Sequence, residues 1–193
     1  MVSAGCAAAI SHATAACVAG GNPDLHVRIP NLAGFPKDEV IIPTHSRNVY
    51  DAAIRAVGVK VLEVDTPEAL DARHRSADGD DLPLRRPGVP DSGPMSTEAI
   101  CAIAKQHGVP VMVDAAAEIL TIPNVHLQRG ATLVGYSGGK FIRGPQSAGL
   151  LLGREGSREG GMGPQRAAPR LLARDEGRPR GDRSECWSRS RAG

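Results

Sequence analysis

A lysine in a glycine-rich turn is the residue of this chain best placed to do chemistry. Lys140 follows Ser137, Gly138 and Gly139 in the stretch YSGGKFIRGPQSAGLLLG. A lysine amine forms a Schiff base with a carbonyl compound once it has lost its proton, and partial burial and the charge of Arg143 would favour that loss. The glycines let the backbone approach a ligand closely, while Ser137 offers a hydroxyl and an amide to a phosphate. A solvated loop lysine is the alternative.

An aspartate ends a short apolar segment upstream of this lysine. Asp114 closes the segment VPVMVD and is followed by three alanines and Glu118. A carboxylate here can keep a pyridine nitrogen protonated, and the alanines leave room for a flat ring. Asp114 could instead cap a helix, and Glu118 is either functional or a solvated helix residue. Together, Lys140 and Asp114 are the pair that a pyridoxal 5′-phosphate site needs.

Two further segments could complete such a site. Ser3, Ala4, Gly5 and Cys6 form a turn that opens an alanine-rich helix, and the backbone amides at a helix N-terminus attract anions such as phosphate. His45 follows the apolar run DEVIIP, at the end of a strand where ligands bind in open α/β sheets. Its ring either stacks on the cofactor or lies in a loop. The four cysteines show no CxxC motif and no pairing with the six histidines, so we expect no metal site.

Short apolar strands alternate with helical segments over the first 150 residues. The expected helices are 3–19, 49–57, a segment that starts at Thr66, and 97–107; the expected strands are 38–43, 59–64, 109–114, 131–136 and 148–152. Because parallel strands are joined by crossover helices, this alternation predicts an α/β fold with a mostly parallel sheet.

Two stretches interrupt the pattern. Residues 71–91 hold three prolines and no run of four apolar residues, so we expect no strand there. Residues 154–193 hold ten arginines and no lysine. Both stretches are rich in Arg, Pro and Gly and are expected to lack stable structure. Each is either a natural linker or the out-of-frame product of GC-rich coding sequence. The chain thus divides into a partial domain, 1–153, and a basic low-complexity tail.

Composition excludes several classes of function. The formal net charge is +2, and the basic tail carries one aromatic residue, Trp187, and no known motif, so a nucleic-acid-binding function is the weakest hypothesis. No apolar run approaches 18 residues and no signal peptide begins the chain. We therefore expect a soluble cytoplasmic protein with reduced thiols.

Four stretches resemble the selenocysteine synthase-like group of fold type I pyridoxal phosphate enzymes. They are VSAGCAAAISHATAACVAGG, IIPTHSRNVYDAAIRAVGVKVLEV, STEAICAIAKQHGVPVMVDAAAE and LVGYSGGKFIRGPQSAGLLLGR. The group includes relatives of L-seryl-tRNA selenium transferase and D-glucosaminate-6-phosphate ammonia-lyase, and the stretches HSRNVYDAAIRAVG and DAAAE are closer to the ammonia-lyase branch. The resemblance implies the large domain of that fold and a homodimer or higher homo-oligomer.

The resemblance also implies roles for individual residues. Lys140 would hold the cofactor as a Schiff base and act as acid and base, Asp114 would pair with the ring nitrogen, and His45 would face the ring. Ser137 and the turn formed by Ala4, Gly5 and Cys6 would hold the phosphate. The implied activity is that of a lyase or transferase acting on an amino acid or amino sugar phosphate, for example ammonia-lyase chemistry, in which deamination and β-elimination proceed through the Schiff base on Lys140.

The chain departs from the resemblance in three places. It starts almost at the phosphate turn, it loses the family pattern after Arg154, and it carries the Arg/Pro-rich stretch 71–91 where the family has an apolar strand. These departures suggest a truncated, frame-damaged copy. The alternative function is therefore a non-catalytic remnant of the same family.

Overall fold

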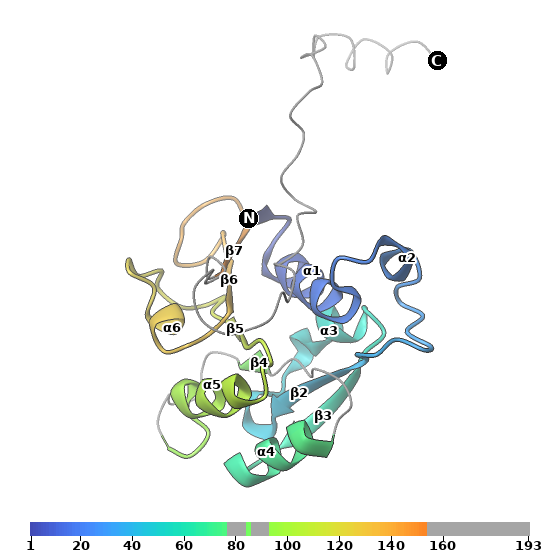
Figure 1. Ribbon diagram of the computed structural model, residues 1–193. Coiled ribbons are helices and arrows are strands. Elements are labelled where there is room, and N and C mark those ends of the chain that lie inside the picture. Colours follow the sequence, from blue (N-terminus) through green and yellow to red (C-terminus); the bar gives the residue numbers. More distant parts are fainter. Residues whose placement is uncertain (77–83, 86–92, 154–193) are drawn as a thin grey trace, which may run out of the picture.

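The structure of the chain, a computed structural model, describes residues 1–76, 84–85 and 93–153 (Figure 1). Its helices are α1 (Cys6–Ala19), α2 (Pro23–His26), α3 (Ala52–Arg55), α4 (Pro67–Ser76), α5 (Thr97–Gln106) and α6 (Val125–Gln128), with 3₁₀ turns η1 (Thr44–Ser46) and η2 (Val49–Asp51). Its strands are β1 (Val2–Ser3), β2 (Glu39–Pro43), β3 (Lys60–Val64), β4 (Leu84–Arg85), β5 (Met112–Asp114), β6 (Leu133–Ser137) and β7 (Gly149–Gly153). The tail expected at 154–193 lies outside the described residues.

The strands form a mixed sheet that is parallel in its central part. Five strands pair in the order β1-β7-β6-β5-β4; β4, β5 and β6 run parallel, and β7 runs antiparallel to both β6 and β1. β2 and β3 form a separate parallel pair, and β2 contacts β4. The connection 138–148 is too short for a crossover helix, which explains why β7 returns antiparallel.

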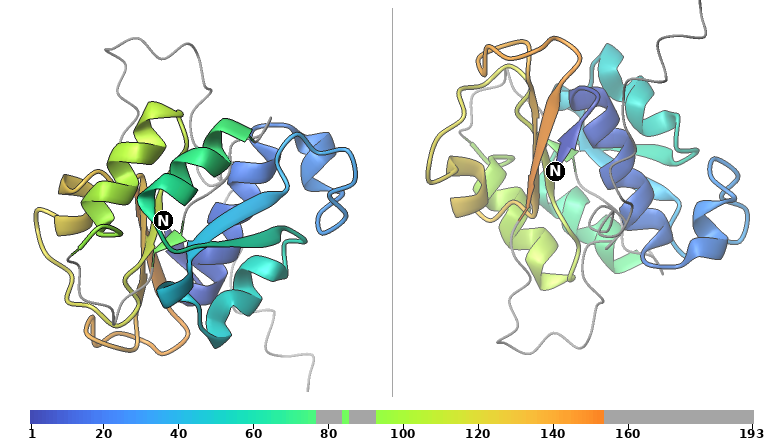
Figure 2. Two further views of the ribbon diagram at one scale, coloured as in Figure 1. Left: turned by 90° about the horizontal axis from the view of Figure 1, so that it is seen from below. Right: turned by 90° about the horizontal axis from the view of Figure 1, so that it is seen from above.

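Helices cover both faces of the sheet (Figures 1 and 2). Successive side chains of a strand point to opposite faces, and the apolar residues of β2 and β5 divide accordingly. Val40, Ile42 and Met112 pack in one cluster with residues of α1 and α3. Ile41 and Val113 pack in another with residues of α4 and α5. The chain is therefore a three-layer α/β/α structure, with a core on each side of the sheet.

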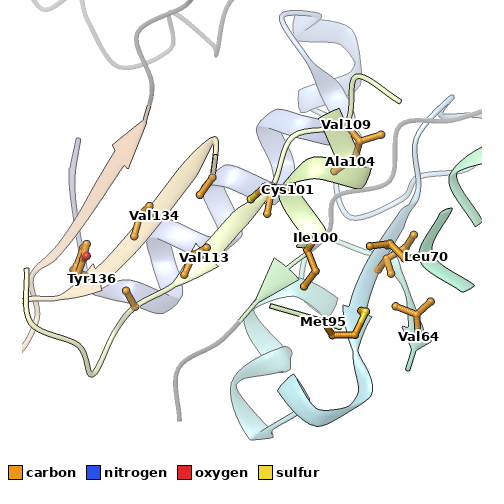
Figure 3. Close-up of a cluster of buried hydrophobic side chains, with 14 residues drawn as sticks. Val64, Leu70, Met95, Ile100, Cys101, Ala104, Val109, Val113, Val134 and Tyr136 are labelled. Carbon is orange, nitrogen blue, oxygen red and sulfur yellow. The ribbon is translucent and has the colours of Figure 1, made fainter. Parts of the chain in front are cut away.

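The second of these cores runs from β6 of the five-stranded sheet to β3 of the separate pair (Figure 3). At one end, Tyr136 and Val134 of β6 lie beside Val113 of β5. The apolar face of α5 covers these strands, and Leu70 and Val64 close the other end. The side chain of Tyr136, which is fully buried in this core, anchors the carboxyl-terminal end of β6.

The expectation that residues 71–91 form no regular structure is wrong in two places. Helix α4 extends into this stretch as far as Ser76. Leu70 and His74 are buried one turn apart on its inner side, and Asp71 pairs with Arg75 on its outer side, which stabilises these turns. Strand β4 lies at 84–85, where it pairs in parallel with β5. An apolar run is not needed for two residues that a neighbouring strand holds by backbone hydrogen bonds.

Other differences concern the ends of elements. The helix expected at 49–57 divides into η2 and α3, and Gly58 with φ of 94° ends the turn that follows α3. The strand expected at 109–114 begins only at Met112. Strand β1 and the four-residue helices α2 and α6 were not expected; the N-cap of α6 is Asn124, whose side chain accepts a hydrogen bond from the Leu127 amide.

Within the described ranges, none of the helices has the length and apolar character needed to cross a lipid bilayer.

Gly149 is the position in β7 where a side chain would disturb the sheet most. A Cβ atom there would lie 2.5 Å from the carbonyl oxygen of Gly5 and 2.6 Å from Oγ of Ser3. We expect Gly149→Ala to lower the free energy of unfolding by about 1–3 kcal/mol, the usual cost of overpacking. Urea denaturation followed by circular dichroism measures it. Gly153→Ala is the control in the same strand, since its Cβ would lie 3.1 Å from the flexible end of Leu133 and at an ordinary contact distance of 3.6 Å from the Thr132 carbonyl oxygen. Equal effects of the two variants would contradict the prediction.

Asp71 joins α4 to α5, and this link should weaken in acid. Its carboxylate pairs with Arg75 and lies 2.7 Å from Nε2 of His107. The hydrogen bonds from Arg75 and then His107 lower the pKa of Asp71 below its ordinary value of 3.8. A lowered folded-state pKa contributes stability that is present above the ordinary pKa and is lost as the pH falls through the lowered one.

We therefore expect Asp71→Asn to lower the melting temperature at pH 5–7 by a few degrees (about 2–5 °C), and the difference from the unmodified chain to shrink below about pH 4. Thermal melts at several pH values measure it. Asp65→Asn, at an exposed position before α4, is the control. A difference that is the same at pH 3 and pH 7 would show that the carboxylate charge is not the cause.

Candidate functional site

The ladder β1-β7-β6 sets the predicted phosphate residues in one row. Ser3 pairs with Gly149 on one side of β7, and Ser137 pairs with Gly149 on the other. Adjacent strands lie about 4.8 Å apart, so the backbones of Ser3 and Ser137 are about 10 Å apart. The turn into α1 follows Ser3, and the Lys140 loop follows Ser137. The ladder therefore brings these two predicted segments to the same end of the sheet.

The N-terminus of α1 presents backbone amides at this end. The N-cap residue Gly5 has φ of 110°, a conformation that residues with a Cβ rarely adopt, and no side chain caps the 14-residue helix. The Ser3 hydroxyl donates to the Gly5 carbonyl over 2.8 Å and so holds the turn. Ala4 is exposed and Cys6 is buried. A helix start of this kind attracts an anion through its amides and its dipole.

Asp114 lies at the carboxyl end of β5 and is 5% exposed. Its Oδ1 accepts hydrogen bonds from the Ala116 amide at 3.0 Å and from the Cys6 thiol at 3.4 Å. Asp114 also pairs in register with Gly135 of β6. The predicted ring partner is thus a buried carboxylate held beside the N-terminus of α1, where the helix dipole favours a negative charge.

Lys140 lies in a closed loop between β6 and β7 and is exposed, so the partial burial expected for its amine is not found. Backbone hydrogen bonds close the loop: the Gly138 amide donates to the Ala148 carbonyl at 2.7 Å, and the Gly144 amide donates to the Gly138 carbonyl at 2.7 Å. The loop leaves no room for side chains at its start, since a Cβ on Gly138 would lie 2.8 Å from the carbonyl oxygen of Ala148. The glycines before the lysine therefore give a rigid loop with an accessible amine.

The segment that follows β2 contacts this lysine through a residue that the sequence did not single out. The Nζ atom of Lys140 lies over the ring of Tyr50, 5.9 Å from its centroid. His45, the residue predicted from this segment, lies in η1 and is exposed. In the sequence, Tyr50 is recognisable only as an aromatic residue five positions after His45. The contact with Lys140, which appears only in the folded chain, marks it as a candidate site residue.

Behind the site, polar groups support the ends of β5 and β6. The Asn124 side chain donates to the Tyr136 hydroxyl at 2.7 Å, and Glu118 lies 2.6 Å from Nε2 of the buried His126. Burial, against the opposing effect of the Asn124 hydrogen bond, raises the pKa of Tyr136 above its ordinary value. Glu118 is therefore not a solvated helix residue: it lies in the bend after β5, and its carboxylate anchors α6 through His126.

No group of three or more His, Cys, Asp or Glu side chains that could hold a metal ion occurs in the part of the chain that the structure describes. The groups that this end of the sheet brings together are the uncapped start of α1, the buried carboxylate of Asp114 and the accessible amine of Lys140.

Comparison with known proteins gives one curated relative and many solved structures. No protein-family model matches the chain. The chain is 33% identical over 165 residues to a 5′-C-glycyluridine monooxygenase-decarboxylase from a Streptomyces species. The match covers 78% of this chain and 39% of that protein. The chain thus spans about two fifths of the length of this relative.

The solved structures share the fold. D-glucosaminate-6-phosphate ammonia-lyase superposes with a TM-score of 0.70 at 24% identity, over 80% of this chain and 43% of that one. A pyridoxal-5′-phosphate dependent protein from Escherichia coli gives 0.56 at 18% identity, over 79% and 38% of the two chains. A methionine gamma lyase from Micromonospora echinospora gives 0.53 at 23% identity, over 81% and 39%. The described part of the chain therefore has the fold of part of the fold type I pyridoxal phosphate enzymes, as the sequence predicted.

Proposed function

We propose that this chain is the cofactor-binding core of a pyridoxal 5′-phosphate-dependent lyase or transferase that acts on an amino acid or an amino sugar phosphate. The observation that carries the proposal is the arrangement of three predicted segments around Gly149 and Gly135. The row from Ser3 to Ser137 places the α1 turn and the Lys140 loop together, and the Cys6 thiol ties the α1 turn to Asp114.

The residues present fit this cofactor. Its phosphate needs an anion site without a side chain in the way, and α1 begins at an uncapped glycine. Its ring nitrogen needs an acidic partner, and Asp114 is a buried carboxylate at a strand end. Its aldehyde needs an amine, and Lys140 offers one on a rigid loop. The residue after Asp114 is the fully buried Ala115, whose side chain is only a methyl group. No large side chain therefore follows the carboxylate directly.

Each group has a defined task in this proposal. When bound, the cofactor supplies an electron sink for the carbon that bears the substrate amine. Lys140 would hold the cofactor through Nζ and could hold or move a proton at that atom. Asp114 would keep a proton on the ring nitrogen, and the amides at Gly5 and Cys6 would bind phosphate together with Ser137. Tyr50 would orient the lysine side chain, and His45 would face the ring.

The substrate class rests on the relatives. One solved relative is named for D-glucosaminate-6-phosphate, and the curated relative for 5′-C-glycyluridine; both names describe an amine on a sugar-derived compound. These names support an amino substrate of that kind for this chain. Membership of the selenocysteine synthase-like group, with ammonia-lyase chemistry and a homo-oligomeric assembly, is part of the same proposal.

The attachment of the cofactor to Lys140 is the first test. The purified chain is incubated with pyridoxal 5′-phosphate, reduced with borohydride and mapped by mass spectrometry. We expect the label at Lys140, and we expect Lys140→Arg to reduce total labelling about tenfold, because a guanidinium does not form the bond. Lys60→Arg is the control, since Lys60 is exposed and pairs with Asp38 at 2.8 Å. Labels spread evenly over the four lysines would favour the non-catalytic alternative.

A pair of glycine variants tests whether the loop itself matters. A Cβ on Gly139 would lie 2.7 Å from Cα of Gln146, whereas the nearest atom to a Cβ on Gly144 is the Gly138 carbonyl oxygen at 3.4 Å. We expect Gly139→Ala to distort the loop and raise the Kd for the cofactor about tenfold, which corresponds to about 1.4 kcal/mol. Gly144→Ala should leave the Kd unchanged. Absorbance titration with the cofactor measures both, and equal affinities would show that the loop geometry does not position Lys140.

A further inference from the structure

The side chain of Cys6 is placed between the two halves of the proposed cofactor site. Cys6 is the first residue of α1, and its thiol lies 3.4 Å from Oδ1 of Asp114. It is 8% exposed, so the contact is shielded from water. A thiol is a weak donor, but in a buried position a bond to a carboxylate is stronger than it would be in water.

A glycine in the neighbouring strand β6 leaves space for this thiol. Gly135 of β6 pairs in register with Asp114, and a Cβ on Gly135 would lie 3.2 Å from Sγ of Cys6. A larger residue at position 135 would push the thiol away from the carboxylate. The contact therefore depends on residues from three elements: α1, β5 and β6.

The thiol and one backbone amide fix the carboxylate together. Both the Cys6 thiol and the Ala116 amide donate to Oδ1 of Asp114. Two donors on one oxygen, one from the strand end and one from the helix start, restrict rotation of the carboxylate about its Cβ–Cγ bond. The same helix start offers amides to a phosphate, so movement of α1 displaces both contacts at once.

We propose that the Cys6 thiol is a positioning residue that orients Asp114 toward the ring nitrogen and couples that carboxylate to the phosphate turn. This inference rests on the proposed function, since it assigns the task of Asp114 to the cofactor ring. The role of Cys6 thus goes beyond its backbone amide, because the side chain acts through Asp114.

Two variants of the full-length chain separate this role from packing. Cys6→Ser keeps a donor of similar size, and Cys6→Ala removes it. The chains are loaded with cofactor that carries ¹⁵N in its ring, and the Kd and the pH at which the ring nitrogen loses its proton are measured by absorbance and ¹⁵N NMR. For Cys6→Ala we expect a Kd about fivefold higher and loss of the proton at lower pH, with both values restored by Cys6→Ser. Cys101→Ala, which removes a buried thiol from α5, is the control.

A second readout does not involve the cofactor. Alkylation of Cys6 by iodoacetamide near pH 8 is followed by peptide mapping in the unmodified chain and in Asp114→Asn. A neighbouring negative charge disfavours the reactive thiolate, so we expect at least about threefold faster alkylation of Cys6 in the variant. The rate at Cys101 should not change.

The outcomes separate the two proposals. If the cofactor binds at Lys140 but Cys6→Ala matches the unmodified chain in Kd and ring protonation, the positioning role is refuted and the proposed function stands. An unchanged alkylation rate in Asp114→Asn refutes the thiol–carboxylate contact directly. If the unmodified chain binds no cofactor, the proposed function and this inference both fail.

Discussion

The close approach of β7 to the start of α1 is the constraint on which the rest of the structure depends. β7 lies between β1 and β6 and runs antiparallel to both, so that Gly149 separates Ser3 from Ser137 by one strand. A glycine is required there, because the backbone of Gly5 and the hydroxyl of Ser3 occupy the space of a Cβ. The helix start and the lysine loop both continue from this row, and their relative position follows from it.

The two main residues of the candidate site, Asp114 and Lys140, are held in place in different ways. Asp114 is buried and is held by a thiol and an amide, whereas Lys140 is exposed and is held only through the backbone of its loop. A buried carboxylate needs donors around it to offset the loss of water. Under the proposed function, Lys140 needs access to a cofactor; its side chain is exposed, while backbone hydrogen bonds close the loop that carries it.

Local patterns predicted most of the elements near the site. The alanine-rich run up to Ala19 forms α1, and the apolar runs before His45 and Ser137 form β2 and β6. Lys140 and Asp114 were predicted as site residues from their places beside glycines and at a strand end, and the structure puts Asp114 at the carboxyl end of β5 and Lys140 in the loop after β6. The stretch 71–91 was misjudged because β4 pairs in parallel with β5, a contact between distant segments that the local sequence does not indicate. Tyr50 was missed because nothing in its local sequence indicates a contact with a lysine 90 positions away.

The sequence by itself determined the layered α/β class and the residue types available for the chemistry, because periodicity, glycine turns and strand-end residues act over short distances along the chain. The tertiary structure decided which of them meet. The pairing of Ser3 and Ser137 across Gly149, the thiol of Cys6 on Asp114, and the ring of Tyr50 under Lys140 all join distant segments. Such contacts depend on strand register and side-chain packing, which are properties of the folded sheet as a whole.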